Sequence, residues 1–466
     1  MPTLKPIILA LALALSPPAC PPLAAQEPPP PEALRSALAL PWASQQQSGR
    51  FEDWLEYMEN GLGPDIPDWL VHSTVVHYSA RKPRYDSSGL PVTGADGRPA
   101  SDPIPQSARI FFPPSWRAPK GHALPLVIYC HATTLRKHGV ASEFGGHEWM
   151  LGAAAAAYYG FAVAMPDQAG MGADTAHDHP FCHAQSLAYS TLDGIPAMRS
   201  AFTEDPFLLA NHYTWDGRLF LVGYSEGAYA ALAATRELQA HPEDYASMGG
   251  APLSGSACMA GPFNLSELSR ADMINPLRET DHCFYLPYVI RGYHAVYGDL
   301  IDPLQIFAPV LLESRADGNI MDWTDGSRNG LTVDALIAGR LGVPSDRVVI
   351  RNLFNPVWLT RELDDPGYEH SVTHQLLRDN DLDRGWAPAT PILFAQSPGD
   401  RDLAPQNTTA ILGNLAAEIA KSGRDPHRLV VFKQLGDCPV GISHLEGALV
   451  GIPLAFQWIY DGMPMD

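Results

Sequence analysis

Short apolar segments alternate with helix-forming segments over much of the chain, and this alternation most constrains its fold. The predicted strands are residues 126–130, 161–165, 219–222, 391–395 and 429–432, and the predicted helices are 149–159, 185–202, 228–240, 408–421 and a last helix from 445. A strand that is apolar at every position is buried on both faces, and such strands joined by helices form a parallel sheet. The sequence therefore predicts the α/β class, with a mostly parallel sheet and helices on both faces.

The alternation lapses between about residues 252 and 389, where turns rich in proline and tyrosine separate helical pieces. An insertion of this length between two sheet strands indicates a separate unit beside the sheet's carboxyl edge. We therefore expect a core in two parts, residues 51–251 and 390–466, and a largely helical cap at 252–389.

The first part of the core is less regular before residue 126. Residues 51–60 place apolar side chains at helical spacing, and residues 73–78 alternate as a strand. Residues 82–106 are rich in proline, glycine, serine and aspartate, so they are predicted to form a loop with room for a hairpin.

The first 25 residues have the features of a signal peptide. Lys5 precedes an apolar stretch at 7–15, and a small-residue region ends at Ala25. We expect a secreted or periplasmic protein, with residues 26–50 as a proline-rich linker and N-terminal segment and no stable membrane anchor. Lipid attachment at Cys20 is the less favoured alternative, because two prolines stand where the processing site usually has leucine and a small residue.

The net charge of −20 argues against a nucleic-acid partner, because phosphate binding needs clustered lysine and arginine. A neutral or apolar substrate suits this charge better. The charge does not indicate an oligomeric state.

The cysteines left after the signal peptide are Cys130, Cys182, Cys258, Cys283 and Cys438. An exported protein can form disulfides, so this odd number predicts one or two bridges and at least one free thiol. Proximity in the sequence favours a Cys258–Cys283 pair.

Residues 223–227, Gly-Tyr-Ser-Glu-Gly, match the G-x-S-x-G pattern of a nucleophilic serine. The motif follows the strand at 219–222 and opens the helix at 228–240, as the pattern requires. The sharp turn from strand to helix needs small neighbours, and it presents Ser225 at the sheet edge beside free helix N–H groups. Ser225 is therefore the predicted nucleophile.

A nucleophilic serine needs a histidine base and an orienting carboxylate, and in this strand–helix pattern they follow in the order serine, acid, histidine. His444 lies between the strand at 429–432 and the last helix, so we expect it to be the base. The loop after the strand at 391–395 holds two aspartates. Asp402 is the preferred acid and Asp400 is the alternative, since a shift within the loop would exchange them.

Two backbone N–H groups are expected to hold the oxyanion. The N–H of Glu226, the residue after the nucleophile, is the expected first donor. Thr133 or its neighbour is the expected second donor, in the loop after the strand at 126–130, where the small residues of His-Ala-Thr-Thr let backbone N–H groups approach the substrate.

Three segments together resemble the secretory lipase family, related to fungal lipases of the Candida lipase A kind. They are the His-Ala-Thr-Thr loop, Pro-Asp-Gln-Ala-Gly-Met-Gly at 166–172 with His-Pro-Phe at 179–181, and Gly-Tyr-Ser-Glu-Gly. The resemblance covers roughly residues 70–460 and implies an α/β-hydrolase fold with a helical cap. It also implies a secreted ester hydrolase whose triad is Ser225, Asp402 and His444.

Histidine, aspartate and cysteine cluster at residues 177–183 as in a metal site. The family resemblance places His179-Pro180-Phe181 in an ordinary loop, so we predict neither a metal nor an organic cofactor.

The predicted function is a carboxylesterase or lipase acting on a small-molecule or lipid ester through an acyl-enzyme. A polyester-cleaving hydrolase or an acyltransferase of the same fold is the alternative, and an exopeptidase is less favoured. A non-catalytic binding module is least favoured, because such modules usually lose a triad member and here every catalytic role has a candidate residue.

Overall fold

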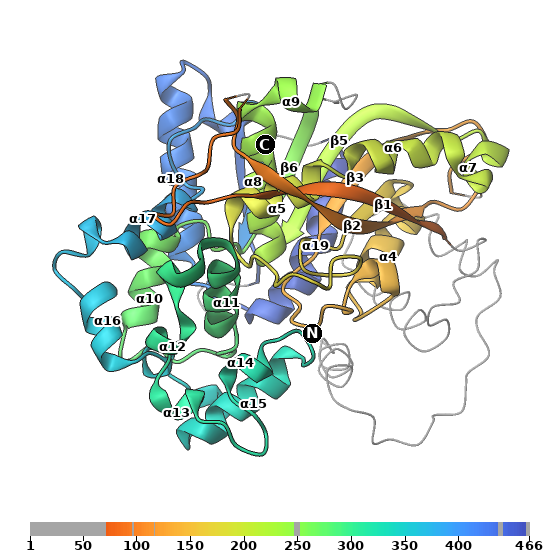
Figure 1. The fold of residues 1–466 in the computed structure, drawn as a ribbon. Coiled ribbons are helices and arrows are strands. Elements are labelled where there is room, and N and C mark those ends of the chain that lie inside the picture. Colours follow the sequence, from red (N-terminus) through yellow and green to blue (C-terminus); the bar gives the residue numbers. More distant parts are fainter. Residues whose placement is uncertain (1–70, 96, 116, 247–251, 437–440, 463–466) are drawn as a thin grey trace.

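The computed structural model describes residues 71–95, 97–115, 117–246, 252–436 and 441–462. The predicted signal peptide, linker and helix at 51–60 lie outside this part of the chain. The described residues build an eight-stranded sheet in the order β1-β2-β4-β3-β5-β6-β7-β8. Strands β3 to β8 are parallel, whereas β1–β2 and β2–β4 are antiparallel pairs. The predicted mostly parallel sheet is confirmed (Figure 1).

The strands are β1 His72–Pro83, β2 Ser101–Phe112, β3 Ala123–Cys130, β4 Ala162–Pro166, β5 Thr214–Tyr224, β6 Leu253–Met259, β7 Ile392–Gln396 and β8 Val430–Gln434. The core helices are α4 Trp149–Tyr159, α5 Ala184–Leu192, α6 Ile195–Glu204, α7 Pro206–Asn211, α8 Glu226–Ala240, α9 Pro242–Ala246, α18 Gln406–Lys421 and α19 His444–Tyr460. The intervening helices are α10 Arg270–Ile274, α11 Tyr285–Tyr297, α12 Pro303–Ile306, α13 Pro309–Leu312, α14 Ile320–Trp323, α15 Gly330–Leu341, α16 Pro356–Glu362 and α17 Val372–Asp379.

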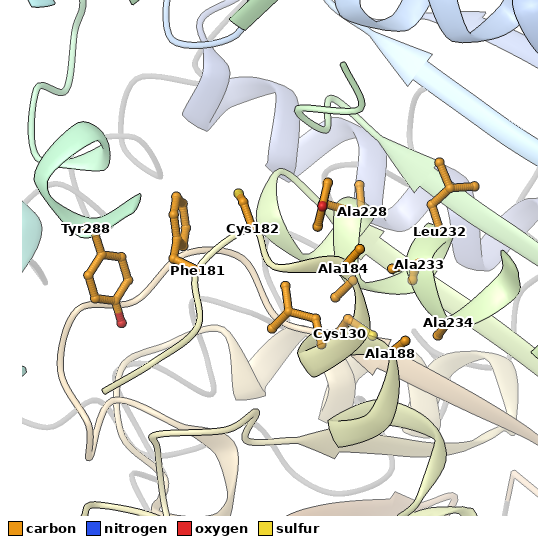
Figure 2. Close-up of a cluster of buried hydrophobic side chains, with 14 of the residues drawn as sticks. Cys130, Phe181, Cys182, Ala184, Ala188, Ala228, Leu232, Ala233, Ala234 and Tyr288 are labelled. Carbon is orange, nitrogen blue, oxygen red and sulfur yellow. The ribbon is translucent and has the colours of Figure 1, made fainter. Parts of the chain in front are cut away.

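The central strands are buried on both faces, as their apolar sequences predict. In β3, Leu126 and Ile128 join one core cluster, while Val127 and Tyr129 join the other. The first cluster includes residues of α5, α6, α8 and α18, and the second includes residues of α4 and α19. Figure 2 shows part of the first layer, where small side chains such as Ala188 and Ala234 let α5 and α8 pack closely.

The predicted helix at 185–202 is two helices, α5 and α6, separated at Asp193 and Gly194. Pro196 stands in the first turn of α6, where its missing N–H costs nothing. The break is therefore explained by a glycine followed by a proline.

The predicted loop at 82–106 is strand only at its two ends, and residues 84–100 between β1 and β2 are not part of either strand. β1 continues to Pro83 and pairs antiparallel with β2 from Ser101 onward. The segment therefore connects the two strands of a hairpin, as its composition allowed.

The cap begins later than predicted. β6 pairs with β5 and β7 inside the sheet, so the predicted boundary at residue 252 is too early. The strand's sequence, Leu-Ser-Gly-Ser-Ala-Cys-Met, lacks the continuous apolar pattern of its neighbours, although Ser256 is fully buried and hydrogen-bonds Thr235. The insertion between β6 and β7 carries α10 to α17, which gather on one side of the molecule, away from α6 and α7 (Figure 1).

The predicted Cys258–Cys283 disulfide is wrong. Cys130, Cys182, Cys258 and Cys283 are buried free thiols. Cys258 lies in β6, whereas Cys283 lies in the cap and donates to Asp334 Oδ1 at 3.2 Å. Cys438 lies outside the described residues.

Among the helices that the structure describes, none combines the length and apolarity needed to cross a membrane.

Candidate active site

Ser225 lies in the turn between β5 and α8 with φ 57° and ψ −123°, a conformation that a non-glycine residue rarely adopts. A Cβ at Gly223 would lie 2.0 Å from the Gly227 oxygen, and a Cβ at Gly227 would lie 2.1 Å from the Cys130 oxygen. Both glycines are therefore required for steric reasons. The Ser225 N–H donates to the Met259 oxygen at 2.9 Å, which fixes the turn against β6.

His444 faces the serine from the first turn of α19. Its Nε2 lies 2.8 Å from Ser225 Oγ. Ser443 and Glu446 form a capping box that sets where the helix begins, and the Tyr224 hydroxyl donates to the His444 carbonyl at 2.7 Å. The structure thus brings together the predicted nucleophile and the predicted base.

The acid in contact with His444 is Asp400. Its Oδ2 lies 2.7 Å from His444 Nδ1. The same oxygen accepts from Gln396 Nε2 at 2.9 Å, and Oδ1 accepts the backbone N–H groups of Asp402 and Leu403 at 3.0 and 2.8 Å. Asp400 and Ser225 occupy both ring nitrogens of His444, so the structure places the alternative acid, Asp400, and not the preferred Asp402, in contact with the histidine.

Asp402 instead binds the cap. Its Oδ1 accepts from the Thr280 hydroxyl at 3.0 Å and from the N–H groups of Asp281 and His282 at 3.1 and 3.0 Å. The turn that Asp400 closes brings the side chain two residues later to this segment of the cap. Asp402 therefore attaches the cap to the loop that carries the acid.

The charges around His444 favour its protonated form. Burial lowers the pKa of His444, but the charge and hydrogen bond of Asp400 and the charge of Asp402 raise it above the ordinary value of 6.5. Burial also raises the pKa of Asp402, while the charges of His444 and His282 lower it.

The loop after β3 lies against the beginning of α8, as the close approach of Gly227 to Cys130 shows. Glu148 Oε1 accepts hydrogen bonds from the Ala132 N–H at 2.8 Å and from the Tyr129 hydroxyl at 2.5 Å. These two contacts anchor the beginning of the loop to the residue that precedes α4. Thr133 follows, and its Oγ1 is buried without a hydrogen-bond partner in the described chain. The oxyanion roles of Thr133 and Glu226 stay predictions.

An apolar cavity of about 110 Å³ opens onto Ser225 and His444. The cap supplies most of its apolar lining: Met273, Tyr285, Leu286, Val289 and Ile350. The core adds Phe181 and Leu403, and charged groups such as Arg278 and Arg401 also line it. Core and cap therefore line together an apolar cavity that reaches the Ser225 hydroxyl and the His444 imidazole.

The histidines of residues 177–183 have separate partners. His177 Nδ1 contacts Asp174 at 2.6 Å, His179 Nε2 contacts Glu226 at 2.5 Å, and His183 Nε2 contacts the Tyr297 hydroxyl at 3.1 Å. Within the described ranges, no group of three or more histidine, cysteine or acidic side chains converges as metal ligands would.

The sheet order, the serine at the β5–α8 turn and the histidine after β8 define an α/β-hydrolase fold. No family model and no curated protein matches the sequence. Solved structures do match.

A protein from Legionella pneumophila described as a putative hydrolase aligns with a TM-score of 0.61 at 18% identity over 89% of this chain and 95% of that chain. The rice cell wall degrading esterase LipA from Xanthomonas oryzae aligns at 0.60 and 20% over 83% of this chain and 89% of its own. Candida antarctica lipase A aligns at 0.51 and 14% over 86% of this chain and 83% of its own. At these identities the likeness concerns the fold, and it confirms the fold that the family resemblance implied.

Sequence reasoning missed Glu148 and the cap residues that meet Asp402. Glu148 directly precedes α4, a position where an acidic residue is usual for helix starts and so gives no signal of its contact with the loop after β3. His282 contacts Asp334 Oδ2 at 3.0 Å, a pairing of residues far apart in the sequence that no local pattern announces.

Proposed function

We propose that this protein is a serine ester hydrolase of the carboxylesterase or lipase type. The observation that carries the proposal is the hydrogen-bonded chain Ser225 Oγ–His444 Nε2–Asp400, with distances of 2.8 and 2.7 Å, at the base of an apolar cavity. Serine, imidazole and carboxylate in this order form the arrangement that activates a hydroxyl nucleophile.

In the proposed reaction, Ser225 Oγ attacks the ester carbonyl carbon while His444 Nε2 takes the hydroxyl proton. Asp400 holds the imidazole in the tautomer that leaves Nε2 free to accept. The carbonyl oxygen becomes an oxyanion held by the N–H groups of Glu226 and Thr133. The carbon–oxygen bond to the alcohol then breaks, and His444 returns the proton to the alcohol. Water hydrolyses the resulting acyl-enzyme by the same route.

The signal-peptide features of residues 1–25 support export as part of the proposal. The neighbours' descriptions as a lipase and as a cell-wall esterase support ester substrates here, without choosing between lipid and other esters.

The direct assay compares p-nitrophenyl butanoate with an aminoacyl p-nitroanilide at equal concentration. We expect turnover of the ester and less than roughly 1% of that rate on the anilide, because the mostly apolar surface of the cavity favours an uncharged acyl chain over a substrate with a charged amino terminus. If the protein cleaved the anilide faster than the ester, the exopeptidase alternative would be favoured over the proposed ester hydrolase.

The pH profile follows from the state of His444. The base must be neutral, so kcat/KM falls as the pH drops through its pKa. Because that pKa is raised, the midpoint of the acid limb should lie above 6.5. Initial rates on p-nitrophenyl butanoate from pH 5 to 9 measure this midpoint. A midpoint well below 6.5 would contradict the inference that Asp400 and Asp402 raise the pKa of His444.

The cavity volume predicts a preference for short acyl chains. An engineered protein cavity of about 150 Å³ holds benzene, so about 110 Å³ accommodates an acyl chain of roughly four or five carbons. Across p-nitrophenyl esters from acetate to palmitate, kcat/KM should peak near butanoate and fall at least about tenfold by palmitate.

Leu286→Ala should move this maximum toward longer chains, because Leu286 lines the cavity. Leu311→Ala is the matched control, since Leu311 is equally a buried cap leucine but does not line it. An unchanged profile in Leu286→Ala, or the same shift in both variants, would show that this cavity does not select the acyl group.

A further inference from the structure

A second histidine–carboxylate pair lies directly behind the nucleophile. His179 Nε2 is 2.5 Å from Glu226 Oε1, and both side chains are 2% exposed. Glu226 is the residue after Ser225, and its other carboxylate oxygen, Oε2, is buried without a hydrogen-bond partner among the described residues. The proposed triad uses neither side chain.

The hydrogen bonds fix the charge of this pair. His179 Nδ1 lies 2.7 Å from the Ala169 carbonyl, which can only accept, so Nδ1 carries a proton. The contact between Nε2 and Glu226 then has two possible forms. In one, a protonated Glu226 donates a hydrogen bond to Nε2 of a neutral imidazole. In the other, Nε2 of an imidazolium donates to a Glu226 carboxylate. In both arrangements the pair carries no net charge.

This neutrality matters because of where Glu226 lies. Its backbone N–H is the donor expected to face the oxyanion, and the residue also lines the cavity. An uncompensated carboxylate there would repel the negative charge that develops on the substrate oxygen. In a buried site such a repulsion is only weakly screened.

We propose that His179 is a positioning residue that neutralises Glu226, so that the anionic transition state forms beside a carboxylate without electrostatic penalty. The inference rests on the proposed ester hydrolysis, since it concerns the oxyanion of that reaction. The proposal gives a joint role to Glu226 of Gly-Tyr-Ser-Glu-Gly and His179 of His-Pro-Phe. Neither motif indicates this role alone.

The backbone around His179 is built to hold this contact. A Cβ at Gly170 would lie 2.5 Å from the His179 nitrogen, and one at Gly292 of α11 would lie 2.8 Å from the His179 oxygen. The imidazole also stacks on Tyr288 of the same helix, with ring centroids 5.6 Å apart. Figure 2 shows Tyr288 beside Phe181, two residues beyond His179, at the contact between cap and core.

The test is a double-mutant cycle with His179→Asn and Glu226→Gln, assayed at pH 8. An asparagine amide can still donate to the Ala169 carbonyl in place of Nδ1, but it does not reach Glu226 as Nε2 does. We expect His179→Asn to lower kcat roughly 10- to 100-fold with KM changed less than about threefold. In the Glu226→Gln background the same change should cost less than about threefold, because no carboxylate remains to be neutralised.

Inhibition by phenylboronic acid, which forms an anionic tetrahedral adduct with a serine, provides a second readout. Its inhibition constant should rise with the fall in kcat in His179→Asn and recover in the double variant. Equal losses in both backgrounds, or no loss in either, would overturn the neutralising role. A wild-type protein that turns over no ester while folded would instead refute the proposed function, so the two failures are distinguishable.

Discussion

Replacing Ser225 with alanine is expected to lower kcat/KM for p-nitrophenyl butanoate by about 10⁴-fold or more, because the acyl-enzyme can no longer form. The remaining rate would reflect the oxyanion donors and substrate binding alone. KM should change little, since Ser225 Oγ is one atom in a cavity whose walls are unchanged. Initial rates over a range of substrate concentrations separate the two constants.

Ser200→Ala is the matched control. Ser200 lies in α6, and its hydroxyl donates to the Ala197 carbonyl of the same helix, so its loss should leave turnover within about twofold. Full activity in a correctly folded Ser225→Ala protein would contradict the assignment of the nucleophile.

Replacing Asp400 with asparagine is expected to lower kcat by about 10⁴-fold with little change in the fold. An asparagine can donate to Nδ1, which favours the imidazole tautomer whose Nε2 carries a proton and cannot accept one from Ser225. Asp400 also accepts the N–H groups of Asp402 and Leu403, and an asparagine oxygen can keep those contacts. Thermal unfolding within a few degrees of wild type would confirm that the loss is chemical.

Asp402→Asn is the comparison that separates the two aspartates. Asp402 hydrogen-bonds the cap, whereas the Nδ1 of His444 is bonded to Asp400, so kcat should fall less than about tenfold in Asp402→Asn. Because the charge of Asp402 raises the pKa of His444, its removal should move the acid limb of kcat/KM to lower pH. A larger loss in Asp402→Asn than in Asp400→Asn would reverse the assignment of the acid.

The reason the sequence suggests Ser225 and His444 but not the acid is physical. Ser225 is determined locally, because two glycines, a buried strand and a helix all lie within a few residues of it. His444 follows from its place between the last strand and the last helix. The choice between Asp400 and Asp402 depends on residues 280–282 of the cap, more than a hundred positions away, which donate three hydrogen bonds to the Asp402 carboxylate.

The same distinction explains the errors in the fold. Strands that are apolar at every position, such as the centre of β3, are evident from the sequence. The sequence pattern does not reveal β6, because the strand contains polar Ser256, whose hydroxyl finds its hydrogen-bond partner only in Thr235 of α8. The cysteine pairing failed because proximity in the sequence does not imply proximity across a sheet and its cap.

The most direct test of the central claim is covalent labelling with a fluorophosphonate, followed by mass spectrometry of the digested protein. Attack by the activated hydroxyl should displace fluoride and leave one phosphonyl group on Ser225, with no labelling of Ser225→Ala and strongly slowed labelling of Asp400→Asn. Stoichiometric labelling at another residue, or a folded wild-type protein that the reagent does not modify, would contradict a serine hydrolase built on Ser225, His444 and Asp400.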